Sequence, residues 1–202
     1  MIQAVIFDFG GVITRNDSTH ARLREFDALL DWPPGTMQAR LFSGEAWELA
    51  STGAISPEEH WARVGVELES RLPPDFRQLK GDPFHLSGIN DEVIALMRRL
   101  RGHCRLALCS NALPGLANLL ETMPEVRALF EVIIISALVG LRKPDPRIFE
   151  LTAERLGLPL AACLVVDDKE RNVCAAEALG MPTVLFRSAA QLEAALRARL
   201  PA

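Results

Sequence analysis

The chemistry suggested by this sequence begins with an aspartate that follows an apolar run and precedes two glycines. In the segment Phe7-Asp8-Phe9-Gly10-Gly11, Asp8 stands at the end of a predicted strand, and glycines let a ligand approach the backbone closely. A carboxylate at such a place can attack an electrophile or bind a cation. An aspartate at a strand end is also common as a turn or cap residue, so Asp8 alone does not define a site.

Two further polar clusters could bind a phosphate group. Ser110 and Asn111 follow another apolar run, and their hydroxyl and amide can donate hydrogen bonds to phosphate oxygens, although the same pair is ordinary in turns. Lys143 is one of only three lysines, and its compact charge just before a predicted helix can neutralise a phosphoryl group. Asp145 can cap that helix without competing with this role of Lys143.

A fourth cluster, Asp167-Asp168, follows a buried apolar run and is the least ordinary of the four. Two adjacent carboxylates repel each other unless a cation lies beside them, and hard oxygen ligands suit Mg²⁺. A purely structural acidic turn is the alternative. The pair therefore indicates a divalent metal site, with Asn172 close behind it in the chain.

The elements that must position these residues are predicted from short apolar runs rich in β-branched side chains. These runs predict strands at residues 4–9, 105–109, 132–135, 163–166 and 183–186. Helix-like segments lie between them, and Asn90 and Asp145, the latter followed by Pro146, provide N-cap signals. The alternation predicts an α/β fold with a doubly wound, mostly parallel, Rossmann-like sheet, whose strand carboxyl ends converge on one crevice.

A long gap between the first two strands breaks this alternation. Residues from about Arg15 to His85 contain no strand-like run but several amphipathic pieces, including a capping box at Ser56-Pro57-Glu58-Glu59. We therefore expect a small α-helical cap domain of residues 15–85, inserted into an α/β core domain of residues 1–14 and 86–202.

Composition limits the class of protein further. The 202 residues suffice for one core with an appendage, and a net charge of −4 leaves no basic footprint for nucleic acid. No apolar run is long enough for a membrane span and the amino terminus does not read as a signal peptide, so we expect a cytoplasmic protein. The four cysteines form no CxxC pair and are expected to be buried thiols. The sequence does not indicate an oligomeric state.

Together and in this order, the motifs FDFGGV, CSN, RKPDP and VVDDKERN resemble the haloacid dehalogenase superfamily over essentially the whole chain. The helical insertion matches the family's cap in position and size. The resemblance implies a Mg²⁺-dependent phosphatase that acts on a small phosphorylated metabolite through an aspartyl-phosphate on Asp8.

The resemblance also implies a role for each matching residue. Asp8 and Lys143 would be catalytic, and the residues that bind substrate would be Gly11, Ser110, Asn111 and Lys143. Mg²⁺ would be held by Asp8, the Gly10 carbonyl and Asp168, with Asp167 and Asn172 as auxiliary groups. Substrate choice is expected to lie with the cap and with Thr14, Arg15 and Asn16; no role is assigned to Trp32, Trp47, Trp61 or His60.

One position departs from the family pattern. Family phosphatases usually carry a second aspartate two residues after the nucleophile, as a general acid, and this chain has Gly10 there. A general acid contributes roughly 10²–10⁴-fold in rate, least for a good leaving group. The substrate is therefore expected to have such a group, as a sugar 1-phosphate or acyl phosphate has, or the protein is slow or inactive. The subgroup with glycine here resembles bacterial sugar-1-phosphate phosphatases.

Two other functions stay open at this point. A phosphate- or metabolite-binding protein could keep the site while lacking efficient chemistry. A 2-haloacid dehalogenase also lacks the second aspartate, but it needs no metal, so the pair Asp167-Asp168 disfavours it.

Overall fold

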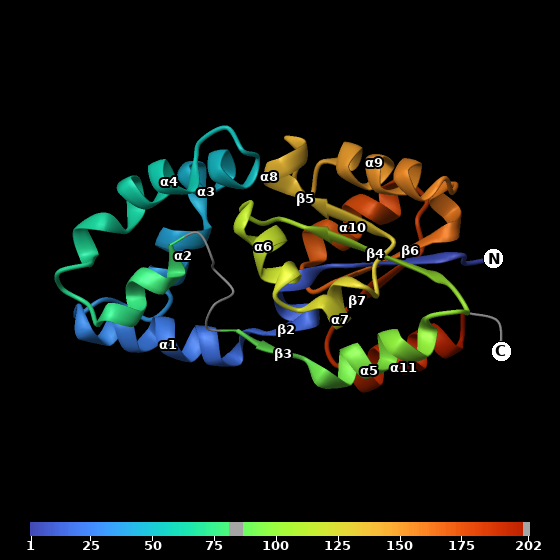
Figure 1. Ribbon diagram of the computed structural model, residues 1–202, viewed down its shortest axis with the longest axis horizontal. Helices are drawn as coiled ribbons and strands as arrows, with labels where there is room; N and C mark the ends of the chain where they lie inside the picture. Colours follow the sequence, from blue (N-terminus) through green and yellow to red (C-terminus); the bar gives the residue numbers. More distant parts are fainter. Residues whose placement is uncertain (81–86, 200–202) are drawn as a thin grey trace.

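Five parallel strands form the central sheet of the molecule, in the order β5-β4-β1-β6-β7 (Figure 1). The computed structural model describes residues 1–80 and 87–199; the side chain of Asn16 lies outside this description. The strands are β1 (Ala4–Phe7), β4 (Arg105–Ser110), β5 (Val132–Ile135), β6 (Cys163–Asp167) and β7 (Thr183–Leu185). The predicted doubly wound, mostly parallel α/β fold is confirmed.

The strand ends differ slightly from the prediction, and the differences fall at the candidate site. β1 stops at Phe7 rather than residue 9, because the chain turns at Asp8 into an irregular turn, η1 (Phe9–Ile13). β4 and β6 each extend one residue further than predicted. Their last residues, Ser110 and Asp167, still pair with Ile135 and Leu185 of the neighbouring strands.

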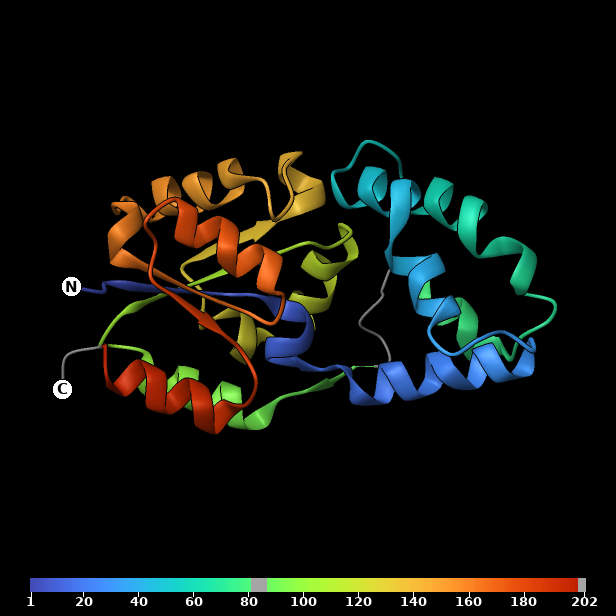
Figure 2. The ribbon, with the colours of Figure 1, turned by 180° about the vertical axis from the view of Figure 1, so that it is seen from behind.

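Helices cover both faces of the sheet (Figures 1 and 2). They are α5 (Asp91–Leu100), α6 (Gly115–Glu121), α7 (Pro124–Arg127), α8 (Ser136–Val139), α9 (Pro146–Leu156), η4 (Leu160–Ala162), α10 (Glu170–Ala178) and α11 (Ala189–Arg197). Buried side chains of α5, α6, α7 and α11 pack on one face and those of α9 and α10 on the other. The predicted caps are confirmed, since the side chain of Asn90 accepts from Val93 N and that of Asp145 from Arg147 N.

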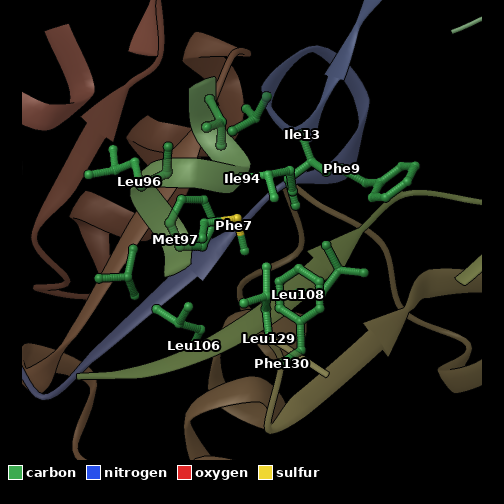
Figure 3. Close-up of a cluster of buried hydrophobic side chains, with 14 of the residues drawn as sticks. Phe7, Phe9, Ile13, Ile94, Leu96, Met97, Leu106, Leu108, Leu129 and Phe130 are labelled. Atoms are coloured by element: carbon green, nitrogen blue, oxygen red, sulfur yellow. The ribbon is translucent and has the colours of Figure 1, made fainter. Parts of the chain in front are cut away.

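Strand β1 shows how the two faces are filled. Its residues are all buried, and they alternate between the two hydrophobic clusters, as side chains do along a strand. Phe7 joins the cluster that Figure 3 shows, against Met97 of α5 and Leu108 of β4. A strand packed on both faces cannot shift its register, so the position of Asp8 at its end is fixed.

The long insertion is helical, as predicted, and lies to one side of the sheet (Figures 1 and 2). Its elements are α1 (Asn16–Leu29), α2 (Thr36–Phe42), α3 (Gly44–Ser51), α4 (Pro57–Val64), η2 (Val66–Leu68) and η3 (Pro74–Leu79). A separate hydrophobic cluster, which we call the cap cluster, joins them: Leu23, Phe26, Leu30, Met37, Leu41, Trp61, Val64, Leu68, Leu72, Phe76 and Leu79. The capping box of α4 is confirmed, because Glu59 N donates to Ser56 Oγ and Ser56 N to Glu59 Oε2.

A short antiparallel ribbon marks where the insertion leaves the sheet domain and returns to it. The ribbon pairs β2 (Thr14–Arg15) with β3 (Gly88–Ile89) and was not predicted from the sequence. Two residues per strand are too few to produce an alternating pattern, and Arg15 lies in a strand rather than in the helical segment. The division into a core of residues 1–14 and 86–202 and a cap of residues 15–85 stays a prediction.

Helix α3 and the turn after it contact the sheet domain. Trp47 and Ala50 pack on Leu113, which follows β4. Gly53 has φ +73°, and a Cβ there would lie 2.3 Å from the carbonyl oxygen of Ala137 in α8. Only glycine allows both this backbone conformation and this close approach.

The cysteines depart in part from the prediction. All four are free; Cys109 and Cys163 are buried, but Cys104 is half-buried and Cys174 is exposed. The expectation was wrong for Cys174 because it lies on the outward side of α10, a feature that spacing between cysteines does not report. None of the described helices is long and apolar enough to cross a membrane.

Candidate active site

The candidate site lies where β1, β4 and β6 end. Asp8 directly follows β1, and its backbone N–H donates to the carbonyl of Val166 in β6 at 2.9 Å. β1 is the central strand, with later strands added on either side, and in such sheets a crevice opens at the carboxyl end of the strand where the order reverses. The fold therefore places Asp8 at the bottom of that crevice.

Lys143 joins two acidic residues that are far apart in the chain. Its Nζ lies 2.9 Å from Asp8 Oδ1 and 2.6 Å from Asp167 Oδ2, and its side chain is 2% exposed. With Asp168, the two aspartates form a group whose ligand oxygens all lie within 4.8 Å of one another. Three carboxylates and one buried lysine leave a local excess of negative charge, which suits a cation.

The charges of Asp8 and Lys143 depend on this environment. Burial raises the pKa of Asp8 to about 7, with Lys143 acting against the increase and Asp167 adding to it. Burial by itself would lower the pKa of Lys143, but the carboxylates of Asp8 and Asp167 outweigh it and raise that pKa. Lys143 is thus held protonated beside Asp8.

Asp167 and Asp168 are adjacent but differ in their partners. Asp167 is fully buried and accepts hydrogen bonds from Lys143 Nζ, Lys169 N and Asn172 Nδ2. Asp168 pairs with Lys169 Nζ through Oδ2 at 2.8 Å, while its buried Oδ1 has no partner among the described residues. A buried oxygen without a donor is costly, and a hard cation would satisfy it. The donor set fits Mg²⁺.

Asn111 holds Lys143 in place. Its Nδ2 donates to the carbonyl of Lys143 and its Oδ1 accepts from the backbone N–H of the same residue, both at 2.7 Å. The peptide bond between Lys143 and Pro144 is cis. Ser110, the last residue of β4, is 1% exposed and lines the cavity beside Asn111. The structure therefore brings both predicted phosphate-binding residues next to Asp8 and gives Asn111 a positioning contact as well.

The two glycines of the first motif are not equivalent. Gly10 lines the cavity with φ −71° and ψ 121°, a conformation open to any residue, so the backbone does not demand glycine there. Gly11 has φ +79°, where glycine is favoured. Its N–H donates to Thr14 Oγ1 at 3.2 Å, and Gly11 is not among the described residues that line the cavity. Its predicted contact with substrate stays a prediction.

A cavity of about 200 Å³ opens above Asp8, between the sheet domain and the insertion. Its insertion side consists of the residues Thr19, His20, Leu23, Gln38, Phe42 and Trp47, together with Ser87 just after the insertion. His20 and Gln38 are hydrogen-bonded at 3.2 Å, and burial lowers the pKa of His20. A cavity of this size suits a small ligand.

Several of these lining residues were missed from the sequence. Arg142 stands inside the RKPDP motif, so its neighbour Lys143 could have drawn attention to it. His20 and Gln38 had no such signal, because they lie on separate helices that only the cap cluster brings together. Of the unassigned aromatics, Trp47 lines the cavity, whereas Trp61 is buried in the cap cluster.

The chain is similar to known proteins over most of its length. A family model described as haloacid dehalogenase-like hydrolase matches residues 2–180. The sesquiterpene phosphatase astK of Aspergillus oryzae is 29% identical, over 89% of this chain and 87% of the relative. Phosphatase MT3486 of Mycobacterium tuberculosis is also 29% identical, over 94% and 89%.

A solved structure agrees in fold. It is a mutant haloacid dehalogenase family enzyme of Bacteroides thetaiotaomicron, in complex with magnesium and inorganic phosphate. The two chains superpose with a TM-score of 0.73 at 21% identity, over 93% of this chain and 95% of the other.

Proposed function

The chain belongs to the haloacid dehalogenase-like hydrolase family, and from this membership we propose that it is a Mg²⁺-dependent phosphatase of a small phosphorylated metabolite. The similarity to two phosphatases supports the reaction. The observation that carries the proposal is the contact of Lys143 with both Asp8 and Asp167, beside an unpartnered oxygen of Asp168. This arrangement provides a nucleophile, a fixed positive charge and a cation site at the carboxyl ends of the strands.

The metal would be held by Asp8, Asp168 and the carbonyl of Gly10, with Asp167 and Asn172 supporting them. When bound, Mg²⁺ supplies positive charge that draws electrons from the phosphoryl group and offsets the charge of the carboxylates. Asp167 already accepts donors at both oxygens, which favours a supporting role for it over a direct one.

The chain's own residues would perform two displacements on phosphorus. Asp8 attacks phosphorus, a bond forms between its carboxylate oxygen and phosphorus, and the bond from phosphorus to the alcohol oxygen breaks. Water then attacks the same phosphorus, releases inorganic phosphate and restores Asp8. Lys143 offsets charge on the phosphoryl oxygens in both steps, and Ser110 with Asn111 orients the group.

Gly10 limits which alcohols can leave. No carboxylic acid stands two residues after Asp8, so the departing oxygen has no proton donor from that position. We therefore propose a substrate with a stable leaving group, such as a sugar 1-phosphate or an acyl phosphate. A dedicated acid is worth about 10²–10⁴-fold in rate, and least for such leaving groups.

Phosphate release tests the reaction. We would measure kcat/KM for sugar 1-phosphates, sugar 6-phosphates and an activated aryl phosphate, with Mg²⁺ and with a chelator. Turnover should require metal and disappear in Asp8→Asn. Activity that persists in that variant would refute the nucleophile, and metal-independent release of halide from 2-haloacids would identify a dehalogenase instead.

The leaving-group argument has its own test in Gly10→Asp, which the backbone at residue 10 permits. The added acid should accelerate esters of poorly leaving alcohols far more than an activated aryl phosphate. Equal acceleration of both would count against a role for leaving-group stability.

The metal ligands are tested by ligand-induced stability. Mg²⁺ at about 100 times its dissociation constant should stabilise the fold by about 2.7 kcal/mol, and Asp168→Asn should remove this effect. The matched control is Asp145→Asn, because asparagine also caps a helix and Asp145 does not belong to the acidic cluster. If a phosphoester binds to a metal-loaded protein that releases no phosphate, the chain is a binding protein.

A further inference from the structure

Two arginines line the cavity in addition to Lys143 and Lys169. Arg142 precedes Lys143, and Arg171 lies in the first turn of α10. Asp8 is the one acidic residue in the described lining of the cavity, whereas Arg142, Lys143, Lys169 and Arg171 all belong to it. This cationic lining occurs in a chain whose net charge is −4, so it is a local feature of the cavity.

The positive charges have different partners. Lys143 is neutralised by Asp8 and Asp167, and Lys169 pairs with Asp168. Arg142 pairs with Glu48 of α3, with Nη1 3.1 Å from Oε1. None of the ion pairs within residues 1–80 and 87–199 engages Arg171. Of the two guanidinium groups, only that of Arg142 therefore has a carboxylate partner within the described part of the chain.

That carboxylate is a weak partner. The side chain of Glu48 is 65% exposed while that of Arg142 is 16% exposed, and an ion pair with one exposed member is screened by water. The Nε of Arg142 is buried without an acceptor among the described residues. Burial lowers the pKa of Arg142, Glu48 opposes this decrease, and the nearby charge of Arg171 adds to it. The two arginines are thus close enough to repel each other.

We propose that Arg142 and Arg171 form a second anion site in the cavity, so that the preferred substrate is a small phosphomonoester whose leaving group carries a carboxylate or a second phosphate. This inference rests on the proposed phosphatase function and assigns the substrate class. An anion placed between two guanidinium groups that have only one exposed counter-ion stabilises both of them, because an anionic acceptor makes charge-assisted hydrogen bonds.

The position of Arg142 assigns this second anion to the leaving group. The phosphoryl group that is transferred must lie against Asp8, where Lys143 and the metal ligands meet its charge. The guanidinium of Arg142 instead contacts Glu48 of α3, on the insertion side of the cavity. The aromatic side chains of Phe42 and Trp47 close that side. The space between Asp8 and these two aromatic side chains therefore allows a short leaving group.

The experiment compares substrates matched in size. We would measure kcat/KM for phosphoglycolate against 2-hydroxyethyl phosphate, which replaces the carboxylate by a hydroxymethyl group, and for glucose 1,6-bisphosphate against glucose 1-phosphate. The first pair tests a carboxylate and the second a phosphate. The wild-type protein should prefer the member with the second anionic group, in at least one pair, by roughly 10- to 100-fold, the effect of a charged hydrogen bond.

The variants assign this preference to the arginines. Arg142→Gln and Arg171→Gln should each reduce the ratio of the two kcat/KM values by about 10-fold, and Arg142→Lys should retain part of it. The matched control is Arg147→Gln, because Arg147 is an exposed arginine of α9 outside the cavity lining. It should leave the ratio unchanged. The second anion site would be overturned if the wild type had equal kcat/KM for the two members of each pair, or if the variants lowered kcat/KM equally for both members.

Binding to Asp8→Asn separates this inference from the proposed function. Calorimetry with the same four compounds and Mg²⁺ measures discrimination in a protein that cannot turn over. If the wild-type protein releases no phosphate but Asp8→Asn still prefers the compounds with a second anionic group and loses that preference with Arg142→Gln, the second anion site stands and the phosphatase function fails. If phosphate is released without such discrimination, the phosphatase function stands and the second anion site fails.

Discussion

The two walls of the cavity are built in different ways. On the sheet side, Lys143 is fixed by Asp8, Asp167 and the side chain of Asn111. On the insertion side, Phe42 and Trp47 are held mainly by packing, with ring centroids 5.6 Å apart at an angle of 82°. The first wall is suited to one chemistry, and the second can change its shape or charge without disturbing that chemistry.

This difference gives different consequences for substitutions in the two regions. A change at Lys143 or at the carboxylates that it contacts should remove the reaction and leave an uncompensated buried charge. A change in the insertion should alter stability or selectivity while the strand-end groups keep their places.

Lys143→Met should abolish turnover and destabilise the fold. The substitution leaves the buried carboxylates of Asp8 and Asp167 without their cation, and breaking a buried pair in this way costs about 3–5 kcal/mol. Denaturant unfolding without metal measures the loss. Lys169→Met is the matched control, since the Lys169 side chain is 53% exposed and its pair with Asp168 is expected to contribute less than about 1 kcal/mol. Similar losses for both lysines would contradict the contrast.

Phe76→Ala should weaken the insertion selectively. Phe76 is fully buried in the cap cluster, edge to face with Phe26, and such a truncation costs about 3–5 kcal/mol. Native-state hydrogen exchange should show faster exchange in residues 16–79 while strands β1, β4 and β6 stay protected. Phe149→Ala removes a buried side chain of α9 that packs on the sheet, so this variant should instead show faster hydrogen exchange in the strands. Uniform loss of protection in Phe76→Ala would show that the insertion and the sheet domain unfold as one unit.

Gly53→Ala should displace the insertion from the sheet domain. The new Cβ would lie 2.3 Å from the carbonyl oxygen of Ala137, in addition to the strain of a positive φ, which is about 1–2 kcal/mol. Gly44→Ala is the matched control, because Gly44 has φ +74° but a Cβ at that position would meet nothing within 4 Å. We expect Gly53→Ala to lower both melting temperature and kcat/KM, and Gly44→Ala to lower melting temperature alone. Equal kinetic effects would exclude a docking role for Gly53.

The smallest expected effect is a pH dependence of stability from His60. Burial lowers the pKa of His60 in the folded protein below its usual value, although the carbonyl of Leu41 opposes this. The unfolded chain therefore binds the proton more readily, and stability should decrease as the pH falls below about 6.5 and be fully present above it. Unfolding from pH 8 to pH 5 should show a shallower decrease in His60→Gln. His103→Gln, at an exposed position in the sheet domain, should resemble the wild type.

Much of the fold followed from local patterns. The runs that formed β1, β4, β5, β6 and β7 are apolar on both faces, and a parallel sheet between helices requires this pattern. The caps at Asn90 and Asp145 and the capping box of α4 were also predicted, because each depends on residues within one turn. The β2–β3 ribbon was missed because two residues carry no periodicity.

For the candidate site, the sequence by itself determined where the groups proposed for the chemistry lie. Asp8, Ser110 and the pair Asp167-Asp168 stand at strand ends, which a parallel sheet brings together, and Lys143 stands just before α9. Only the tertiary structure decided what faces them. Arg142 acquires Glu48 as a partner, and Trp47 and His20 reach the cavity, through the packing of separate helices in the insertion. The reason is physical. A strand end is defined by its own few residues, whereas the position of a helix that docks on it is set by contacts between segments far apart in the chain.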